Sequence, residues 1–288
     1  MNWFLLSLYT AFALATEAAL LKRWFSDLGP WDMCAIPFFY SLPFYAIGLA
    51  FVEIPVLQPG YWPIFAWVLP LTMIAVVFHF RAIYSSPLSL TMPFLAFTPV
   101  FVIITGHVLL GETLGIQGIG GILLVMAGGY VLNLDSTSSG WLAPIKAIGN
   151  EPGSLYMLVA ASLYGLCAVG GKMLILRSSP WFAGIFFFLI FDIALVGMLL
   201  LTRRTTLKQL CRKPAKGIVA GVVVVTEIIA HHLAISLVHA AYMVAIKRLA
   251  GIFAVGYGWL WFREANIRCR LLGTAIMTAG AMCIAAFG

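Results

Sequence analysis

Long apolar stretches dominate this chain, and they constrain its fold more than any other feature. Ten stretches of roughly 20 residues are each long enough to cross a hydrocarbon core of about 30 Å. They cover residues 3–21, 33–52, 62–80, 88–110, 114–134, 155–176, 181–201, 218–238, 240–262 and 271–287. Backbone groups inside a membrane must be satisfied within the protein, so stretches of this kind form helices. The sequence therefore predicts an all-α integral membrane protein with ten transmembrane helices.

The composition excludes several other classes of protein. Hydrophobic residues make up 62% of the chain and charged residues only 9%, whereas roughly a quarter of the residues in soluble domains are charged. The net charge of +7 does not indicate nucleic-acid binding, because the basic residues lie in short loops between apolar stretches. The five cysteines show neither CxxC nor Cys/His ligand spacing. We therefore expect no metal site, no cofactor and no nucleic-acid partner.

Scarce residue types recur between the two halves of the chain. At one offset Lys22, Pro30 and Trp31 fall on Lys172, Pro180 and Trp181. An offset two residues longer aligns a second set: His79 with His231, Phe101 with Phe253, Glu112 with Glu264, Gly121 with Gly273, and Gly128 with Gly280. Because Lys, His, Glu and Pro are rare in this composition, the matches indicate a tandem duplication.

The duplication predicts the domain organisation. Two five-helix repeats, residues 1–134 and 154–288, are joined by a linker at 135–153 that is rich in Ser, Gly and Pro. An odd number of spans per repeat makes the second repeat enter the membrane from the opposite side. Such inverted repeats surround a site that opens alternately to the two faces. We therefore expect two inverted five-helix repeats around a central cavity.

The distribution of Lys and Arg predicts the orientation in the membrane. One set of loops carries Lys22, Arg23, Lys146, Arg203, Arg204, Lys208, Arg212, Lys213, Lys216, Arg263, Arg268 and Arg270, with Arg81 at the edge of a further loop. The opposite set carries little beyond Arg177. By the positive-inside rule the basic set is cytoplasmic and both termini lie outside. We expect a multi-pass protein of a cell membrane, with the bacterial inner membrane as its location.

A glycine- and proline-rich segment carries a family resemblance. Residues 87–130 read PLSLTMPFLAFTPVFVIITGHVLLGETLGIQGIGGILLVMAGGY, which is a proline-containing helix, a Gly-Glu at its end and a glycine-spaced final helix. This pattern resembles the half-repeat of the drug/metabolite transporter superfamily, EamA type. The second copy, residues 240–281, has Arg263-Glu264 in place of Gly111-Glu112 and keeps the following glycines. The resemblance implies a ten-helix metabolite transporter or exporter with a cavity between its halves, and it implies no particular substrate.

Ionisable side chains inside spans are the default functional candidates, because each costs about 2.5–3.5 kcal/mol to insert. Lys247 and Arg248 are adjacent in the ninth span. Successive residues of a helix point about 100° apart, so a continuous helix does not direct both at one point. We expect at least one of them to enter the cavity and bind a carboxylate or phosphate. The alternatives are structural ion pairs with Glu227, Asp192 or Glu17, and snorkelling to an interface.

Glu227 and His231 lie four residues apart in the eighth span and therefore share one helix face. A carboxylate beside an imidazole in a poorly hydrated site is suited to exchanging a proton during transport. His231 and its repeat equivalent His79 are also candidates for binding the substrate. Hydrogen bonding between helices is the alternative explanation for both histidines.

Four further acids and a tyrosine complete the candidate site residues. Glu17 and Asp192 are candidate counter-ions or coupling groups for the cationic pair. Tyr242 is a weaker substrate-binding candidate, because it lies five residues before Lys247 and does not share its face. Glu112 and Glu264 lie at the turns between the last two spans of each repeat, where we expect them to be structural caps of helix N-termini.

Together these features predict a secondary transporter, and specifically an exporter, that moves a small polar or anionic metabolite by alternating access with proton coupling. The alternatives are a flippase or exporter of amphipathic or lipid-linked molecules and a membrane-embedded enzyme. We expect no enzymatic activity, because the loops are short and the acids scattered. The expected partners are a small-molecule substrate and membrane lipid, with the chain acting as a monomer or homodimer.

Overall fold

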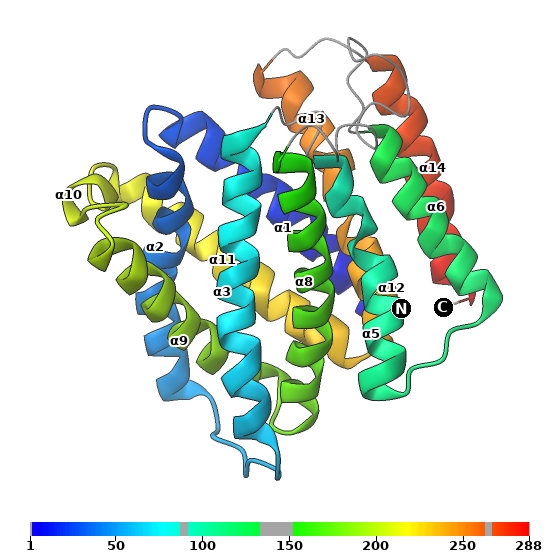
Figure 1. Ribbon diagram of the computed structural model, residues 1–288, viewed down its shortest axis with the longest axis horizontal. Helices are drawn as coiled ribbons and strands as arrows, with labels where there is room; N and C mark the ends of the chain where they lie inside the picture. The colour runs from blue at the N-terminus through cyan, green and yellow to red at the C-terminus, as the bar shows by residue number, and fades with distance from the viewer. Residues whose placement is uncertain (1, 87–91, 133–151, 263–266, 288) are drawn as a thin grey trace.

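A computed structural model describes residues 2–86, 92–132, 152–262 and 267–287, and in this part the chain is a bundle of helices joined by short turns (Figure 1). The helices are α1 (Asn2–Phe25), α2 (Pro30–Phe51), α3 (Tyr61–Ser85), η1 (Met92–Phe97), α5 (Thr98–Leu110), α6 (Ile116–Leu132), α8 (Pro152–Leu176), α9 (Pro180–Leu201), α10 (Leu207–Leu210), α11 (Pro214–Ser236), α12 (Ala240–Lys247), α13 (Ala250–Phe262) and α14 (Ile267–Phe287). In the described residues, seven helical segments are long and apolar enough to cross a membrane, and three apolar segments are shorter. These ten segments match the ten predicted spans.

The packing of the helices follows the predicted inverted duplication. Helix α3 packs against α8, and α1 packs against α11, which is the same contact after exchange of the two halves. The other two major contacts join equivalent helices directly: α2 with α9 at one end of the bundle and α6 with α14 at the other (Figure 1). This pattern is a two-fold pseudo-symmetry between the repeats. The centre of the bundle is therefore built from both halves of the sequence.

The fourth and ninth spans are each divided into two helical segments. In the fourth span the 3₁₀ helix η1 precedes α5, which has Pro99 in its first turn. Proline is tolerated there because that position needs no amide donor. In the ninth span α12 ends at Lys247 and α13 begins at Ala250. The Leu249 amide bonds the Ile246 carbonyl at 2.9 Å, a 3₁₀-type contact, so this interruption covers Arg248 and Leu249 and involves no proline.

One face of the bundle carries the α1–α2 turn and the segment before α11, with their Lys and Arg residues, and is called the basic face here. On this face, polar contacts connect the α1–α2 turn to the segment before α11. Lys213 Nζ donates to Asp27 Oδ1 at 2.7 Å and to the Trp24 carbonyl at 2.6 Å. Arg212 lies 3.2 Å from the other oxygen of Asp27. The hydrogen bond from Lys213 lowers the pKa of Asp27 below its usual value. These bonds join a loop of each repeat at this face.

Glycines allow α6 and α14 to approach closely. A Cβ added at Gly128 would lie 2.6 Å from the Met277 amide nitrogen and 2.7 Å from the Gly273 carbonyl. A Cβ at Gly280 would lie 2.6 Å from the Gly121 carbonyl. The repeat-equivalent glycines therefore face each other across the interface, where small residues let two backbones touch.

The α6–α14 interface predicts a position-specific cost for one added methyl group. We expect Gly128→Ala to lower the free energy of unfolding by about 1–3 kcal/mol, because the backbones must separate to admit the new carbon. Gly120→Ala is the matched control on the same helix, since nothing lies within 4 Å of its added Cβ. Thermal unfolding in detergent measures both variants. Equal unfolding temperatures for the two variants would contradict the close packing.

Candidate functional site

A cavity of about 530 Å³ lies inside the bundle, between helices of both repeats. Its volume is within the range of about 300–1,000 Å³ that is typical of small-molecule sites. The polar residues that line it are Glu17, Thr72, His79, Thr98, Tyr164, Cys167, Glu227, His231, His232, Lys247 and Arg248. The structure thus brings residues from α1, α3, α5, α8, α11 and the ninth span to one place.

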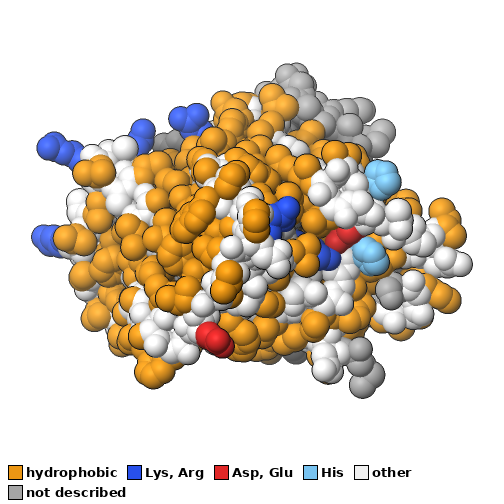
Figure 2. Space-filling model, turned by 90° about the horizontal axis from the view of Figure 1, so that it is seen from below, with side chains coloured by type: hydrophobic (Ala, Val, Ile, Leu, Met, Phe, Trp, Pro, Cys, Tyr) orange, Lys and Arg blue, Asp and Glu red, His pale blue; other side chains and the backbone are white. Residues whose placement is uncertain are grey.

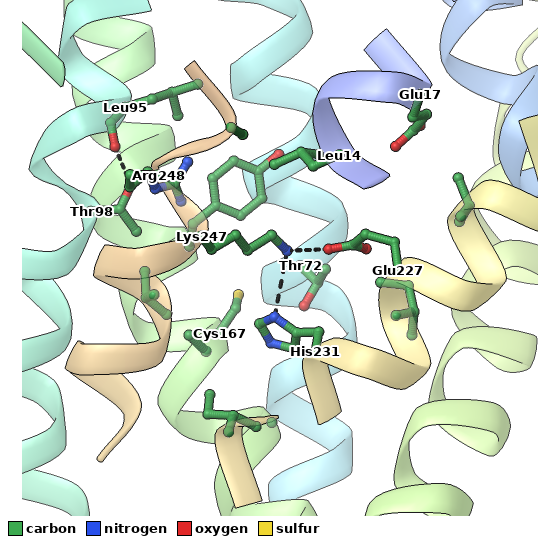
Figure 3. Close-up of a pocket in the computed structure, with 18 of the residues that line it drawn as sticks. Leu14, Glu17, Thr72, Leu95, Thr98, Cys167, Glu227, His231, Lys247 and Arg248 are labelled. Carbon is green, nitrogen blue, oxygen red and sulfur yellow. Dashed lines mark hydrogen bonds and ion pairs between the residues drawn. The ribbon is translucent and has the colours of Figure 1, made fainter. Parts of the chain in front are cut away.

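Lys247 is held by two residues of α11. Its Nζ lies 2.7 Å from Glu227 Oε1 and 3.5 Å from His231 Nδ1 (Figure 3). The Lys247–Glu227 contact is an ion pair by distance, although its angle is not that of a hydrogen bond, since Glu227 Oε1 has no hydrogen-bond partner. The predicted one-face arrangement of Glu227 and His231 therefore places a carboxylate and an imidazole against the same ammonium group.

Arg248 lines the same cavity without a counter-ion. Its Nε is buried and has no hydrogen-bond partner, and no ion pair to Arg248 occurs in the described parts of the chain. A charge inside a protein is normally paired, because an uncompensated one is costly. The Arg248 guanidinium is therefore available to an anion that enters the cavity.

The two adjacent cations of the ninth span reach the same cavity. A continuous helix would direct them about 100° apart, which led us to expect that both would not face the same point. Both nevertheless line the cavity, and the span is interrupted directly after Lys247. We expected at least one of them to enter the cavity, and both lie on its wall.

Two more predicted residues lie on the cavity wall. His79 of α3 contacts the Tyr164 hydroxyl, with its Nδ1 at 3.2 Å. Glu17 of α1 also lines the cavity and makes no hydrogen bond within the described residues (Figure 3). The charged groups that act on Glu17 are Glu227 and Lys247. The pairing of residues far apart in the sequence is a result of the tertiary fold.

Asp192 and Tyr242 lie outside the cavity. Asp192 is fully buried between α9 and α2, where its Oδ2 accepts a hydrogen bond of 2.5 Å from the Ser41 hydroxyl. Tyr242 is 2% exposed, and its ring occupies the space over Gly118, where any side chain would clash with it. Neither residue contacts the cationic pair, so their roles in binding or coupling remain predictions.

Glu112 contacts a helix of the opposite repeat. Its two carboxylate oxygens accept from the amide of Ala240, at 3.3 Å and 3.0 Å, which is the first residue of α12. Oε1 also accepts from Lys172 Nζ at 2.5 Å. The carboxylate lies at a helix N-terminus, as expected, but at that of α12 and not of the helix that follows it. Its repeat equivalent Glu264 lies outside the described residues.

Sequence reasoning missed several polar residues of the cavity wall. Tyr164, Cys167 and Gly171 recur along α8 at helical spacing and therefore share the face that lines the cavity. This spacing is the sequence signal that could have identified Tyr164 and Cys167. Thr72 and Thr98 carry no such signal, because isolated hydroxyl residues are common in membrane helices. His232 of α11 is a further polar residue of this wall. Its Nδ1 lies 2.8 Å from the Ile228 carbonyl, and its ring also lines the cavity.

Comparison with known proteins agrees with this geometry. The sequence profile of the EamA-like transporter family matches residues 1–134. A solved structure titled "Crystal structure of protein" has a TM-score of 0.77 to this chain at 18% sequence identity and covers 98% of this chain and 97% of that chain. No curated protein sequence matches the chain. At this identity the solved structure shows the fold alone, and it shows that the fold extends through both halves.

The resemblance seen in the sequence is therefore confirmed for the first repeat: residues 1–134 match the EamA-like transporter family of the drug/metabolite transporter superfamily, and the chain has a multi-span membrane fold.

Proposed function

We propose that this protein is a secondary transporter that exports a small polar or anionic metabolite by alternating access, with proton movement coupled to transport. The observation that carries the anionic substrate is Arg248, a cavity-lining guanidinium with a buried, unpartnered Nε. Guanidinium groups bind carboxylates and phosphates through two parallel hydrogen bonds. Export is proposed from the resemblance to metabolite exporters.

The charges of the cavity support a division of labour between the two cations. Lys247 is compensated by Glu227 at 2.7 Å, so it contributes little net charge to an incoming solute. Arg248 has no such partner in the described residues. The proposed anion therefore binds first at Arg248, and it reaches Lys247 only by competing with Glu227.

Glu17 is the proposed proton-coupling group. It lines the same cavity, and no described residue donates a hydrogen bond to it. Protonation of Glu17 would remove one negative charge from a site that holds two carboxylates and two basic side chains. The protonated site would then carry a net positive charge and favour an anion. Binding of a proton and of an anion are coupled in this scheme by charge alone.

One feature of the cavity favours a second candidate, the transport of amphipathic molecules. Helices α2 and α9 contribute only apolar lining residues, which are Phe38, Ala183, Phe187, Phe188 and Phe191. Phe188 contacts the ring of His232, with ring centroids 5.6 Å apart, so the apolar wall adjoins the polar one. A solute with an acidic group and an apolar body would contact both. A ligand panel should therefore include anions with and without an apolar body.

The role of Arg248 predicts selective stabilisation by anions. We expect carboxylates or phosphates to raise the unfolding temperature of the purified protein, because a ligand of the folded state adds to its stability. Arg248→Gln should weaken that affinity by a factor of about 10 to 150, which corresponds to the 1.5–3 kcal/mol typical of a charged hydrogen bond. Thermal shift across a series of ligand concentrations measures the affinity of each protein.

Arg177→Gln is the matched control, since it removes a basic side chain that bonds only the Met173 carbonyl in the described structure and does not line the cavity. It should keep the anion response of the parent. A folded Arg248→Gln protein with the full anion response would remove Arg248 from the site. A parent protein that responds to no anion would overturn the anionic substrate.

The charge scheme also predicts a pH dependence of anion binding. Affinity should rise as pH falls, because protonation of Glu17 removes a negative charge from the cavity. Glu227, Lys247, Arg248 and the lining histidines face the same cavity, and protonation of the histidines acts in the same direction. Glu17→Gln should therefore flatten the slope of affinity against pH between about pH 5 and 8 and leave the histidine contribution. Titration calorimetry at several pH values measures the slope, and an unchanged slope in Glu17→Gln would exclude this role.

A further inference from the structure

Lys172 connects three separate parts of the chain at one face of the bundle. Its Nζ donates to Glu112 Oε1 at 2.5 Å and to the Val238 carbonyl at 2.6 Å. The amide of Ala240 donates to the same carboxylate at 3.0 Å. The cluster therefore joins α8 of the second repeat to the α5–α6 turn of the first repeat and to the α11–α12 turn. Both charged side chains are only 11% exposed.

This cluster lies directly beyond one end of the central cavity. On α8, Gly171 and Ile175 line the cavity and flank Lys172. On the other side Ile235 lines the cavity just before the α11–α12 turn, and Val244 lines it one turn into α12. The cavity wall and the ion-pair cluster are therefore built from the same short segments.

Apolar side chains surround the cluster. Leu110, Leu114 and Val238 pack against the core group that also contains Ile175 and Ile235. Figure 2 shows the molecule from below, with mostly apolar side chains and a small group of basic, acidic and histidine side chains to the right of the centre. An ion pair in such surroundings is poorly screened and is stronger than an exposed one.

Lys172 provides all the hydrogen bonds between α8 and these two turns in the described residues. The remaining contacts there are apolar, and apolar contacts are not directional. On the opposite face, the duplication aligns Lys22 with Lys172, but Lys22 is exposed where Lys172 is buried.

We propose that the Lys172–Glu112 ion pair is a latch that closes the cavity toward the face of the α5–α6 and α11–α12 turns. Separation of the pair releases α8 from both turns and admits solute from that face. The latch concerns access and is independent of which solute the cavity binds, so its test needs no known substrate.

Cys167 provides a built-in reporter, because it lies on α8 and lines the cavity. A protein with Cys34, Cys211, Cys269 and Cys283 replaced retains this single thiol. Its reaction rate with a membrane-impermeant maleimide is measured in intact cells and in inverted membrane vesicles. Two further proteins that lack Cys167 serve as labelling references for the two faces. Val56→Cys places a thiol at a side chain 94% exposed on the latch face, which is the face of the α5–α6 and α11–α12 turns. Lys208→Cys places a thiol at an exposed position on the basic face.

The latch predicts a change in labelling from one face only. In Glu112→Gln and in Lys172→Met, labelling of Cys167 from the latch face should rise by about tenfold to a hundredfold, which is the equilibrium factor of one charged hydrogen bond. Lys172→Arg retains the cation and should label more slowly than Lys172→Met. Arg177→Gln, which removes a nearby charge outside the cluster, should label as the parent does.

Two results would overturn the latch. One is an unchanged rate from the latch face in folded Glu112→Gln and Lys172→Met proteins. The other is an equal rise from both faces, which would indicate general loosening of the bundle. Glu112→Asp keeps a carboxylate at the start of α12 with a shorter reach, so it serves if the other variants do not fold. If Arg248→Gln loses the anion response of the parent, the proposed anion site remains supported after either result. That experiment tests binding in the cavity and not closure of the cavity.

Discussion

The cost of burying charge inside a membrane organises this protein. Each ionisable group within a span must find a partner, a cavity or an interface, because lipid offers none. Lys247 forms an ion pair with Glu227, and Lys172 forms one with Glu112. Among the described residues Arg248 has no acidic partner, and its side chain lines the cavity. The position of these groups in the bundle therefore distinguishes charges that have a protein partner from Arg248, which we propose pairs with a solute.

Interrupted helices make this arrangement compatible with a spanning structure. A continuous helix satisfies its own backbone, but it distributes adjacent side chains around its circumference. The ninth span is interrupted after Lys247, inside the bundle and beside the cavity, where unsatisfied backbone groups are least costly. Discontinuous helices at the meeting point of two repeats are a recurring way to build a transport site. Here the interruption lies beside two neighbouring cations of the cavity wall.

Much of the fold followed from periodicity and repetition. Ten apolar stretches predicted ten spans, and scarce matched residues predicted the inverted duplication that the helix contacts show. The glycines that repeat between the halves meet across the α6–α14 interface. Pattern reasoning succeeded for these features because length and residue size act locally or through a simple symmetry. It failed at the interruption of the ninth span, since no proline marks it.

The sequence by itself determined that this chain spans a membrane as two related halves, and it named Lys247, Arg248, Glu227 and His231 as candidates. Only the tertiary structure decided their partners. Glu17 reaches the cavity whereas Asp192 turns to Ser41, although both are single acids in apolar spans. The physical reason is that pairing depends on how helices distant in sequence are rotated and packed. Periodicity within one helix does not record that rotation.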